Sequence, residues 1–68
     1  MSLTNQEKID IIDSHIKSSE KNEYNLYLSI LTEQEKENND TIVASLEKQL
    51  DDEKKKQVAL KAEKEKIK

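Results

Sequence analysis

Apolar side chains recur along this chain at alternating steps of three and four residues, first over residues 9–30 and again over residues 43–67. Written as heptads, the first half places Ile9, Ile16, Glu23 and Ile30 at position a, with Ile12, Ser19 and Leu26 at position d. The second half places Val43, Leu50, Gln57 and Lys64 at a, with Leu46, Glu53, Leu60 and Ile67 at d. This spacing gathers one set of side chains on one side of an α-helix, so we predict two long helices.

The two halves mirror each other about Asn38 and Asn39. When the chain is folded back so that paired numbers sum to 76, matching layers meet: Ile30 with Leu46, Leu26 with Leu50, Glu23 with Glu53, Ser19 with Gln57, Ile16 with Leu60, and Ile9 with Ile67. We therefore predict an all-α fold, an antiparallel two-helix hairpin that packs like a coiled coil.

The ends of the two helices carry recognisable signals. Thr4 and Glu7 fit a capping box, in which each residue bonds the backbone N–H of the other. Asn38 and Asn39 tolerate the left-handed backbone that a turn needs, and Asn39 or Asp40 is expected to cap the second helix. The chain has neither Gly nor Pro, which favours uninterrupted helices. We predict one domain, residues 1–68, with helix one over about 4–37, the turn over 38–40 and helix two over 41–68.

Residues 17–23 form a polar stretch in the first helix and include Ser18 and Ser19. Two interpretations are open, a continuous helix with a poor apolar side or a break in the helix. Continuity is favoured, because the matching layer of the second half is polar too and keeps the same register. Whether residues 1–3 belong to the natural protein is left open by the sequence.

The heptad pattern does not account for every apolar residue. Tyr24, Tyr27, Leu28 and Leu31 lie on a second stripe of the first helix. A helix that is apolar on more than one side is buried on more than one side, which a lone hairpin cannot achieve. With Ile11, Ile42 and Val43 added, we expect a second apolar face near the turn. These residues predict self-association, most simply a homodimer forming an antiparallel four-helix bundle, with a trimer or larger assembly left open.

The polar layers allow more than one interpretation. Glu23 facing Glu53 would be unfavourable if both were buried and ionised. The favoured expectation is that both side chains reach into solvent; the alternatives are a device that fixes the pairing and a shared cation. A di-metal site in a helical bundle would need Glu-x-x-His motifs, and the single histidine, His15, has no such context. We expect no metal site.

Composition argues against an enzyme. The chain has one histidine, no cysteine and no Gly-rich phosphate loop, and a slender hairpin offers little concavity in which to hold a set of catalytic groups. His15 is expected to be a surface residue. We predict no catalytic residues, no cofactor and no cofactor-binding residues.

Charge is divided unevenly along the chain. Residues 1–53 carry a net charge of −8 and residues 54–68 a net charge of +5, which gives the formal charge of −3. In the hairpin the basic end lies beside Glu7, Asp10 and Asp13, so internal complementarity explains the division. The pairs Asp51–Lys55 and Asp52–Lys56 are expected to support the second helix. Overall acidity, the absence of arginine and the lack of aromatic residues near these lysines argue against nucleic acid as a partner.

No apolar run is long enough to span a bilayer, and no stretch combines a basic with a strongly apolar face, so no membrane association is expected. A soluble, intracellular protein is the expectation, with the compartment unknown.

The segments NQEKIDIIDSHI (5–16) and EYNLYLSILTEQ (23–34), followed by a Lys/Ala/Glu-rich second helix, resemble short uncharacterised helical-hairpin proteins of marine cyanophages and related metagenomic sequences. The resemblance implies a phage or environmental source, in the host cytoplasm or with the virion, and no activity.

The function predicted from these features is a non-enzymatic structural or assembly protein that acts through helix–helix self-association. The alternative is a small regulatory binder that docks on a host or other partner protein. In either case, Tyr24, Tyr27, Leu28 and Leu31 are the expected contact residues.

Overall fold

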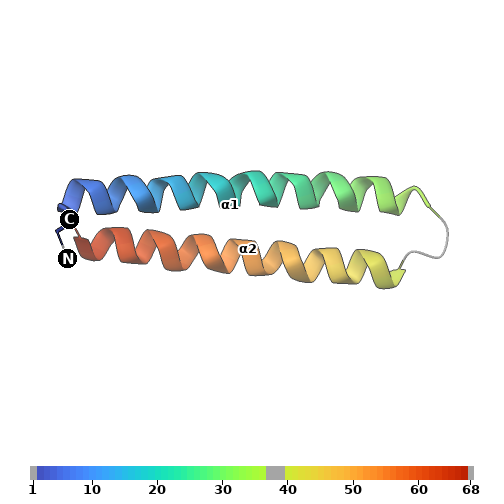
Figure 1. Ribbon diagram of the computed structural model, residues 1–68. Coiled ribbons are helices and arrows are strands. Elements are labelled where there is room, and N and C mark those ends of the chain that lie inside the picture. Colours follow the sequence, from blue (N-terminus) through green and yellow to red (C-terminus); the bar gives the residue numbers. More distant parts are fainter. Residues whose placement is uncertain (1, 37–39, 68) are drawn as a thin grey trace.

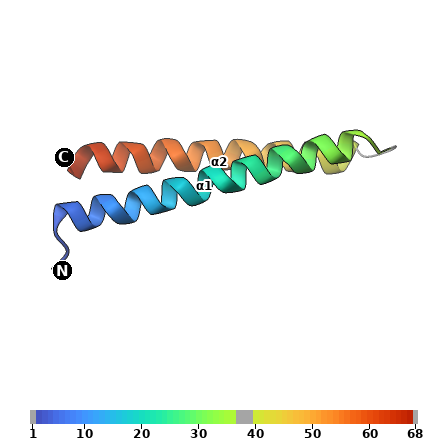
Figure 2. The same cartoon turned by 90° about the horizontal axis from the view of Figure 1, so that it is seen from above.

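Two helices lie side by side and run in opposite directions, as predicted (Figure 1). In the computed structural model, which describes residues 2–36 and 40–67, α1 spans Asn5–Gln34 and α2 spans Asp40–Ile67. The hairpin is a rod of 53 × 17 × 14 Å. The start of α1 and the end of α2 lie at the same end of this rod, and the view from above shows the helices crossing at a shallow angle (Figure 2).

The predicted capping box starts α1. Thr4 has an extended backbone, its Oγ1 accepts a hydrogen bond from Glu7 N at 3.1 Å, and Glu7 Oε1 accepts one from Thr4 N at 3.0 Å. These bonds satisfy N–H groups that have no partner within the helix. The Thr4 N–H, together with other contacts to Thr4, lowers the pKa of the Glu7 carboxyl below its ordinary value of 4.5.

The first helix is continuous through residues 17–23, which confirms the favoured interpretation of that polar stretch. It ends at Gln34, earlier than the expected residue 37. Glu35 N bonds Thr32 O at 3.3 Å and Lys36 N bonds Glu33 O at 3.0 Å, a tighter pattern typical of a helix end. The expected turn residues Asn38 and Asn39 lie outside the described residues, and α2 is already helical at Asp40.

Heptad positions a and d are the ones that the hairpin buries. Every residue that the sequence places at a or d in either helix is buried or half-buried, whereas nearly all other described residues are exposed. The predicted heptad positions are therefore confirmed in both helices.

The apolar part of this interface is small. Among the described residues, Ile12 and Ile30 are the only hydrophobic ones that are fully buried, and Ser19 and Gln57 are buried with them. Short chains bury too little surface to be strongly stable alone. The hairpin has a thin core with a polar centre.

Ion pairs follow the charge division only in part. Lys64 Nζ reaches across to Asp13 Oδ1 at 2.7 Å and joins the basic end of α2 to the acidic first turns of α1, as expected. The predicted pair Asp51–Lys55 is present at 3.1 Å. The predicted pair Asp52–Lys56 is wrong, because Lys56 Nζ instead contacts Glu53 Oε1 at 3.2 Å. Glu53 is held in place by a further hydrogen bond and so offers the lysine a fixed acceptor.

Candidate interaction surface

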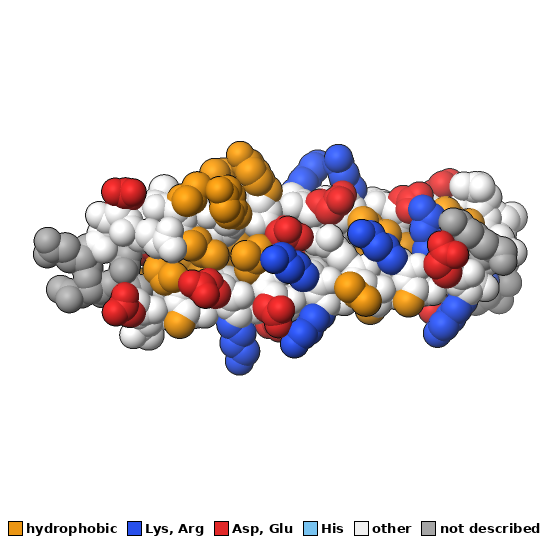
Figure 3. Space-filling model, turned by 180° about the vertical axis from the view of Figure 1, so that it is seen from behind, with side chains coloured by type: hydrophobic (Ala, Val, Ile, Leu, Met, Phe, Trp, Pro, Cys, Tyr) orange, Lys and Arg blue, Asp and Glu red, His pale blue; other side chains and the backbone are white. Residues whose placement is uncertain are grey.

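Four large apolar side chains form a stripe on the outer side of α1, which we call the tyrosine stripe: Tyr24, Tyr27, Leu28 and Leu31. Their spacing of three and four residues places them one above another on one helical face. Their exposed fractions range from 40% for Leu28 to 61% for Tyr24. Figure 3 shows hydrophobic side chains gathered on α1 in the half nearer the turn. The hairpin leaves this face uncovered, as the sequence predicted.

The two tyrosines order each other. Their ring centroids are 6.2 Å apart and the ring planes are inclined by 29°, a stacked arrangement of residues i and i+3. Stacked rings form a wider and stiffer apolar surface than two independent side chains. The two rings therefore form one continuous apolar surface on α1.

A shallow groove runs between the tyrosines and α2. Leu50 contributes an apolar side chain to it and Lys54 a positive charge, opposite acidic residues of α1. The groove is lined by Glu20, Glu23, Tyr24, Tyr27, Leu50, Lys54 and Gln57. On the side facing α2, the tyrosine stripe is therefore bordered by a groove whose lining is mostly polar and carries both acidic and basic side chains.

The sequence placed three further residues on this apolar face, and the structure corrects the expectation. Val43 is half-buried between the helices. Ile42 is 51% exposed, but its heptad position lies on the opposite flank of the helix–helix interface from Tyr27. Ile11 lies near the chain ends, where it lines a depression with Leu3 and Ile67. Val43 and Ile42 therefore face other sides of the hairpin than the stripe does, and Ile11 lies toward the other end of the 53 Å rod.

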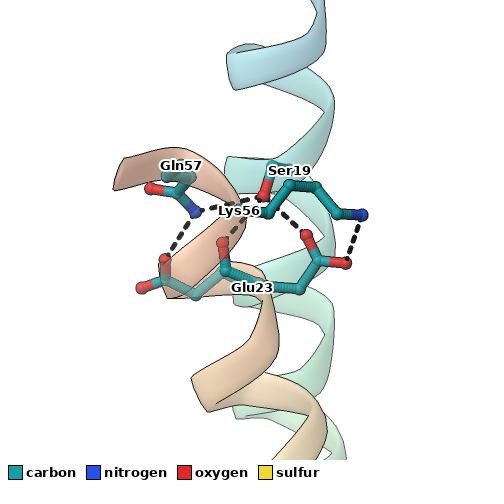
Figure 4. Close-up of polar contacts among 5 residues, drawn as sticks. Ser19, Glu23, Lys56 and Gln57 are labelled. Atoms are coloured by element: carbon teal, nitrogen blue, oxygen red, sulfur yellow. Dashed lines mark hydrogen bonds and ion pairs between the residues drawn. The ribbon is translucent and has the colours of Figure 1, made fainter. Parts of the chain in front are cut away.

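The middle of the hairpin holds a network of polar side chains, which we call the polar layer: Ser19, Glu23, Glu53 and Gln57 (Figure 4). Ser19 Oγ, only 1% exposed as a residue, lies 2.5 Å from Glu53 Oε2 and 3.2 Å from the Glu53 carbonyl oxygen. Gln57 Nε2 donates to Ser19 Oγ at 3.4 Å and to Glu23 Oε1 at 2.9 Å. The predicted match of Ser19 with Gln57 is thus a direct hydrogen bond.

The two carboxylates of this layer take separate donors. Glu23 binds the Gln57 amide, while Glu53 binds the Ser19 hydroxyl and Lys56 Nζ, and the Glu53 side chain is only 14% exposed. The Ser19 hydrogen bond outweighs partial burial and, with Lys56, lowers the pKa of the Glu53 carboxyl below its ordinary value of 4.5. The expectation that this side chain reaches into solvent is therefore wrong for Glu53: protein donors hold it in place.

The sequence predicts the members of the polar layer and the match of Ser19 with Gln57, but not the bonds of Ser19 with Glu53 and of Gln57 with Glu23. The available signal was the run of Ser and Glu at adjacent interface positions opposite Gln and Glu, which supplies donors as well as acceptors.

His15 is exposed, as expected. Within residues 2–36 and 40–67, no group of three or more His, Cys, Asp or Glu side chains could hold a metal ion. Neither described helix has an apolar stretch long enough to cross a membrane.

No protein-family model, curated protein or solved structure matches this chain. The resemblance to cyanophage hairpins therefore stays a prediction. What the hairpin offers for function is its geometry: a polar layer whose groups bond one another, and a tyrosine stripe open to a partner.

Proposed function

We propose that this protein is a non-enzymatic structural or assembly module that self-associates through the tyrosine stripe, forming a homodimer of coiled-coil-like hairpins with four helices. One observation carries the proposal. Four large apolar side chains, aligned on one helical face, are at least 40% exposed, while among residues 2–36 and 40–67 the fully buried hydrophobic side chains are Ile12 and Ile30 alone.

The size of the stripe supports association. Aromatic side chains carry roughly 150–250 Å² each and leucines somewhat less, so two tyrosines and two leucines about half exposed leave on the order of 300 Å² uncovered per copy. Covering two stripes removes roughly 600 Å² from water, worth about 15 kcal/mol at ~25 cal/mol per Å². Association costs about 4–15 kcal/mol in lost freedom. Stable interfaces bury roughly 1,200–2,000 Å² in total, so the two stripes supply the apolar centre of such an interface and residues around them complete it.

The chemistry available elsewhere on the hairpin supports a non-enzymatic role. The buried polar groups are engaged with one another, because Gln57 donates to Ser19 and Glu23, and Ser19 is hydrogen-bonded to Glu53. Catalysis needs a nucleophile, base or acid presented to a substrate in a concave site. The groove beside the tyrosines is shallow and borders the stripe, which suits a contact surface.

Replacing Tyr27 by Glu tests the proposal. A charge in the middle of the stripe should abolish the oligomer measured by light scattering after gel filtration, because it would be buried without a partner. The matched control is Asn25→Glu, which adds the same charge at an exposed position of the same turn and should leave the oligomer intact.

The two variants also separate the competing functions. If Tyr27→Glu and Asn25→Glu have the same oligomeric state as the unmodified protein, the stripe is not the contact surface. A monomer with exposed tyrosines in all three proteins would favour the alternative, a regulatory binder whose partner is another protein.

A further inference from the structure

We infer that the second copy packs with its α1 antiparallel to the first, so that Lys21 of each copy faces Glu35 of the other. This inference rests on the proposed self-association and adds its geometry: which helices meet, in which direction, and which charged residues flank them. Three features carry it: the angular position of the stripe, the order of its side chains, and the charges at its two ends.

The position of the stripe selects the helices that meet. At about 100° per residue, the centre of the tyrosine stripe lies roughly 120° around α1 from the positions that face α2. All four of its residues belong to α1, and Ile42 of α2 points to the other flank. Pairing of two stripes therefore places the two α1 helices at the centre of the dimer and the two α2 helices on its outer sides.

The order of side chains favours the antiparallel direction. In an antiparallel pairing about an axis between Tyr27 and Leu28, paired numbers sum to 55, so Tyr24 meets Leu31 and Tyr27 meets Leu28. Each ring then packs against a smaller leucine of the other copy, and the layers have similar total volumes. A parallel pairing stacks ring on ring and leucine on leucine, which leaves unequal layers and poorer packing.

The charges at the two ends favour the same direction. Lys17 and Lys21 lie on the stripe's side of α1 one to two turns before Tyr24, and Glu35 follows Leu31 by one turn. Glu20, at the lysine end, lines the groove beside Lys54. Among the ion pairs of the described chain, none involves Lys21 or Glu35. Antiparallel pairing brings Lys21 close to Glu35 of the second copy, whereas parallel pairing places like charges together.

The absence of cysteine from the chain permits a clean cross-linking test. We would prepare Lys21→Cys and Glu35→Cys, which leave the stripe intact, and treat each alone and both mixed with a short bismaleimide. In the inferred dimer, residue 21 of one copy lies near residue 35 of the other. Two copies of residue 21 lie roughly 20 Å apart along the helix at about 1.5 Å per residue. The mixture should therefore give cross-linked dimer, and each variant alone should give little.

Charge exchange provides the second readout. Lys21→Glu and Glu35→Lys should each raise the dimer dissociation constant about fivefold at low salt, because each change affects two ion pairs of a two-fold dimer. The double variant should restore the original value. Circular dichroism of each variant verifies that the hairpin remains helical.

The outcomes separate this inference from the proposed function. If the protein is dimeric but Lys21→Cys cross-links with itself, the α1 helices are parallel and the inference is wrong while self-association stands. A dimer that gives no cross-link in the mixture also overturns the inferred pairing. If the unmodified protein is monomeric, the proposed function fails and the inferred geometry fails with it.

Discussion

The polar layer and the tyrosine stripe invert the usual distribution of residues. Ser19 and Gln57 are buried between the helices, whereas Tyr24 and Tyr27, a few residues along α1, are 61% and 49% exposed. The polar layer is complete, because its hydroxyl, amide and carboxylates have partners on the opposite helix. The stripe is incomplete, because its rings contact each other but nothing covers them.

The difference shows what each region contributes. Buried polar groups cost little when hydrogen-bonded, and they disfavour other pairings, in which they would lose their partners. Sliding the helices by one heptad would place Ser19 opposite Leu50 and Glu23 opposite Leu46. The polar layer therefore favours one way of closing the hairpin, and the stripe is the surface through which we propose that the closed hairpin associates.

The largest expected effect on stability comes from the core, and two adjacent residues, Ile30 in the core and Leu31 in the stripe, allow the two regions to be compared. Ile30→Ala removes a fully buried apolar side chain from a thin core and should lower the free energy of unfolding by about 2–4 kcal/mol. Leu31→Ala is the matched control, because Leu31 is 43% exposed. Urea titrations at two protein concentrations should show the Ile30 effect at both and the Leu31 effect chiefly at the higher one. An equal effect at low concentration would contradict the assignment of Leu31 to the stripe.

An intermediate effect is expected from the polar layer. Ser19→Ala removes a buried hydroxyl that bonds both Gln57 and Glu53, so the free energy of unfolding should fall by about 1–2 kcal/mol. Ser18→Ala changes an exposed neighbour and should leave stability unchanged or slightly higher, since alanine favours helix. Thermal unfolding of the two variants compares them directly. If Ser19→Ala is as stable as Ser18→Ala, the polar layer contributes nothing to closure.

The smallest expected effect is the loss of folding stability at low pH. Because the Ser19 hydroxyl holds the folded-state pKa of Glu53 below 4.5, the ionised carboxylate stabilises the fold above that pH, and this contribution disappears as the pH falls through the lowered folded pKa. The melting temperature should therefore fall as the pH is lowered from about 5 through the lowered folded pKa of Glu53. Glu53→Gln should reduce the fall, and Glu7→Gln should reduce it further, since the pKa of Glu7 is lowered too. A fall of the same size in the double variant would place the acid sensitivity elsewhere.

Much of the hairpin follows from the sequence because its information is periodic. The heptad positions identify the buried residues of both helices, and Thr4 with Glu7 identifies the start of α1. The stripe follows from the same reasoning, since Tyr24 and Leu31 cannot face α2 when Glu23 and Ile30 do. The heptad repeat of the sequence determines which side of a helix each residue occupies.

Periodicity cannot determine which of several nearby partners a long side chain chooses. Glu23 and Glu53 lie opposite each other within the polar layer, yet neither bonds the other. Glu23 bonds Gln57 and Glu53 bonds Ser19, because the carboxylates take donors and avoid each other. Lys56 binds Glu53 and not Asp52 for the same reason: hydrogen bonding fixes one acceptor and leaves the other at the surface. Ile11 was misplaced although its number fixes its position along the rod: it lies 23 residues before the end of α1, roughly 35 Å at about 1.5 Å per residue, and therefore near the chain ends.

Sedimentation equilibrium of the unmodified protein at several concentrations tests the central claim most directly. If the tyrosine stripe is a self-association surface, the fitted mass should be about twice the 7.9 kDa of one chain at high concentration and should decrease only on dilution. A mass of one chain at every concentration, with the hairpin fully helical, would contradict self-association and leave the stripe to a different protein.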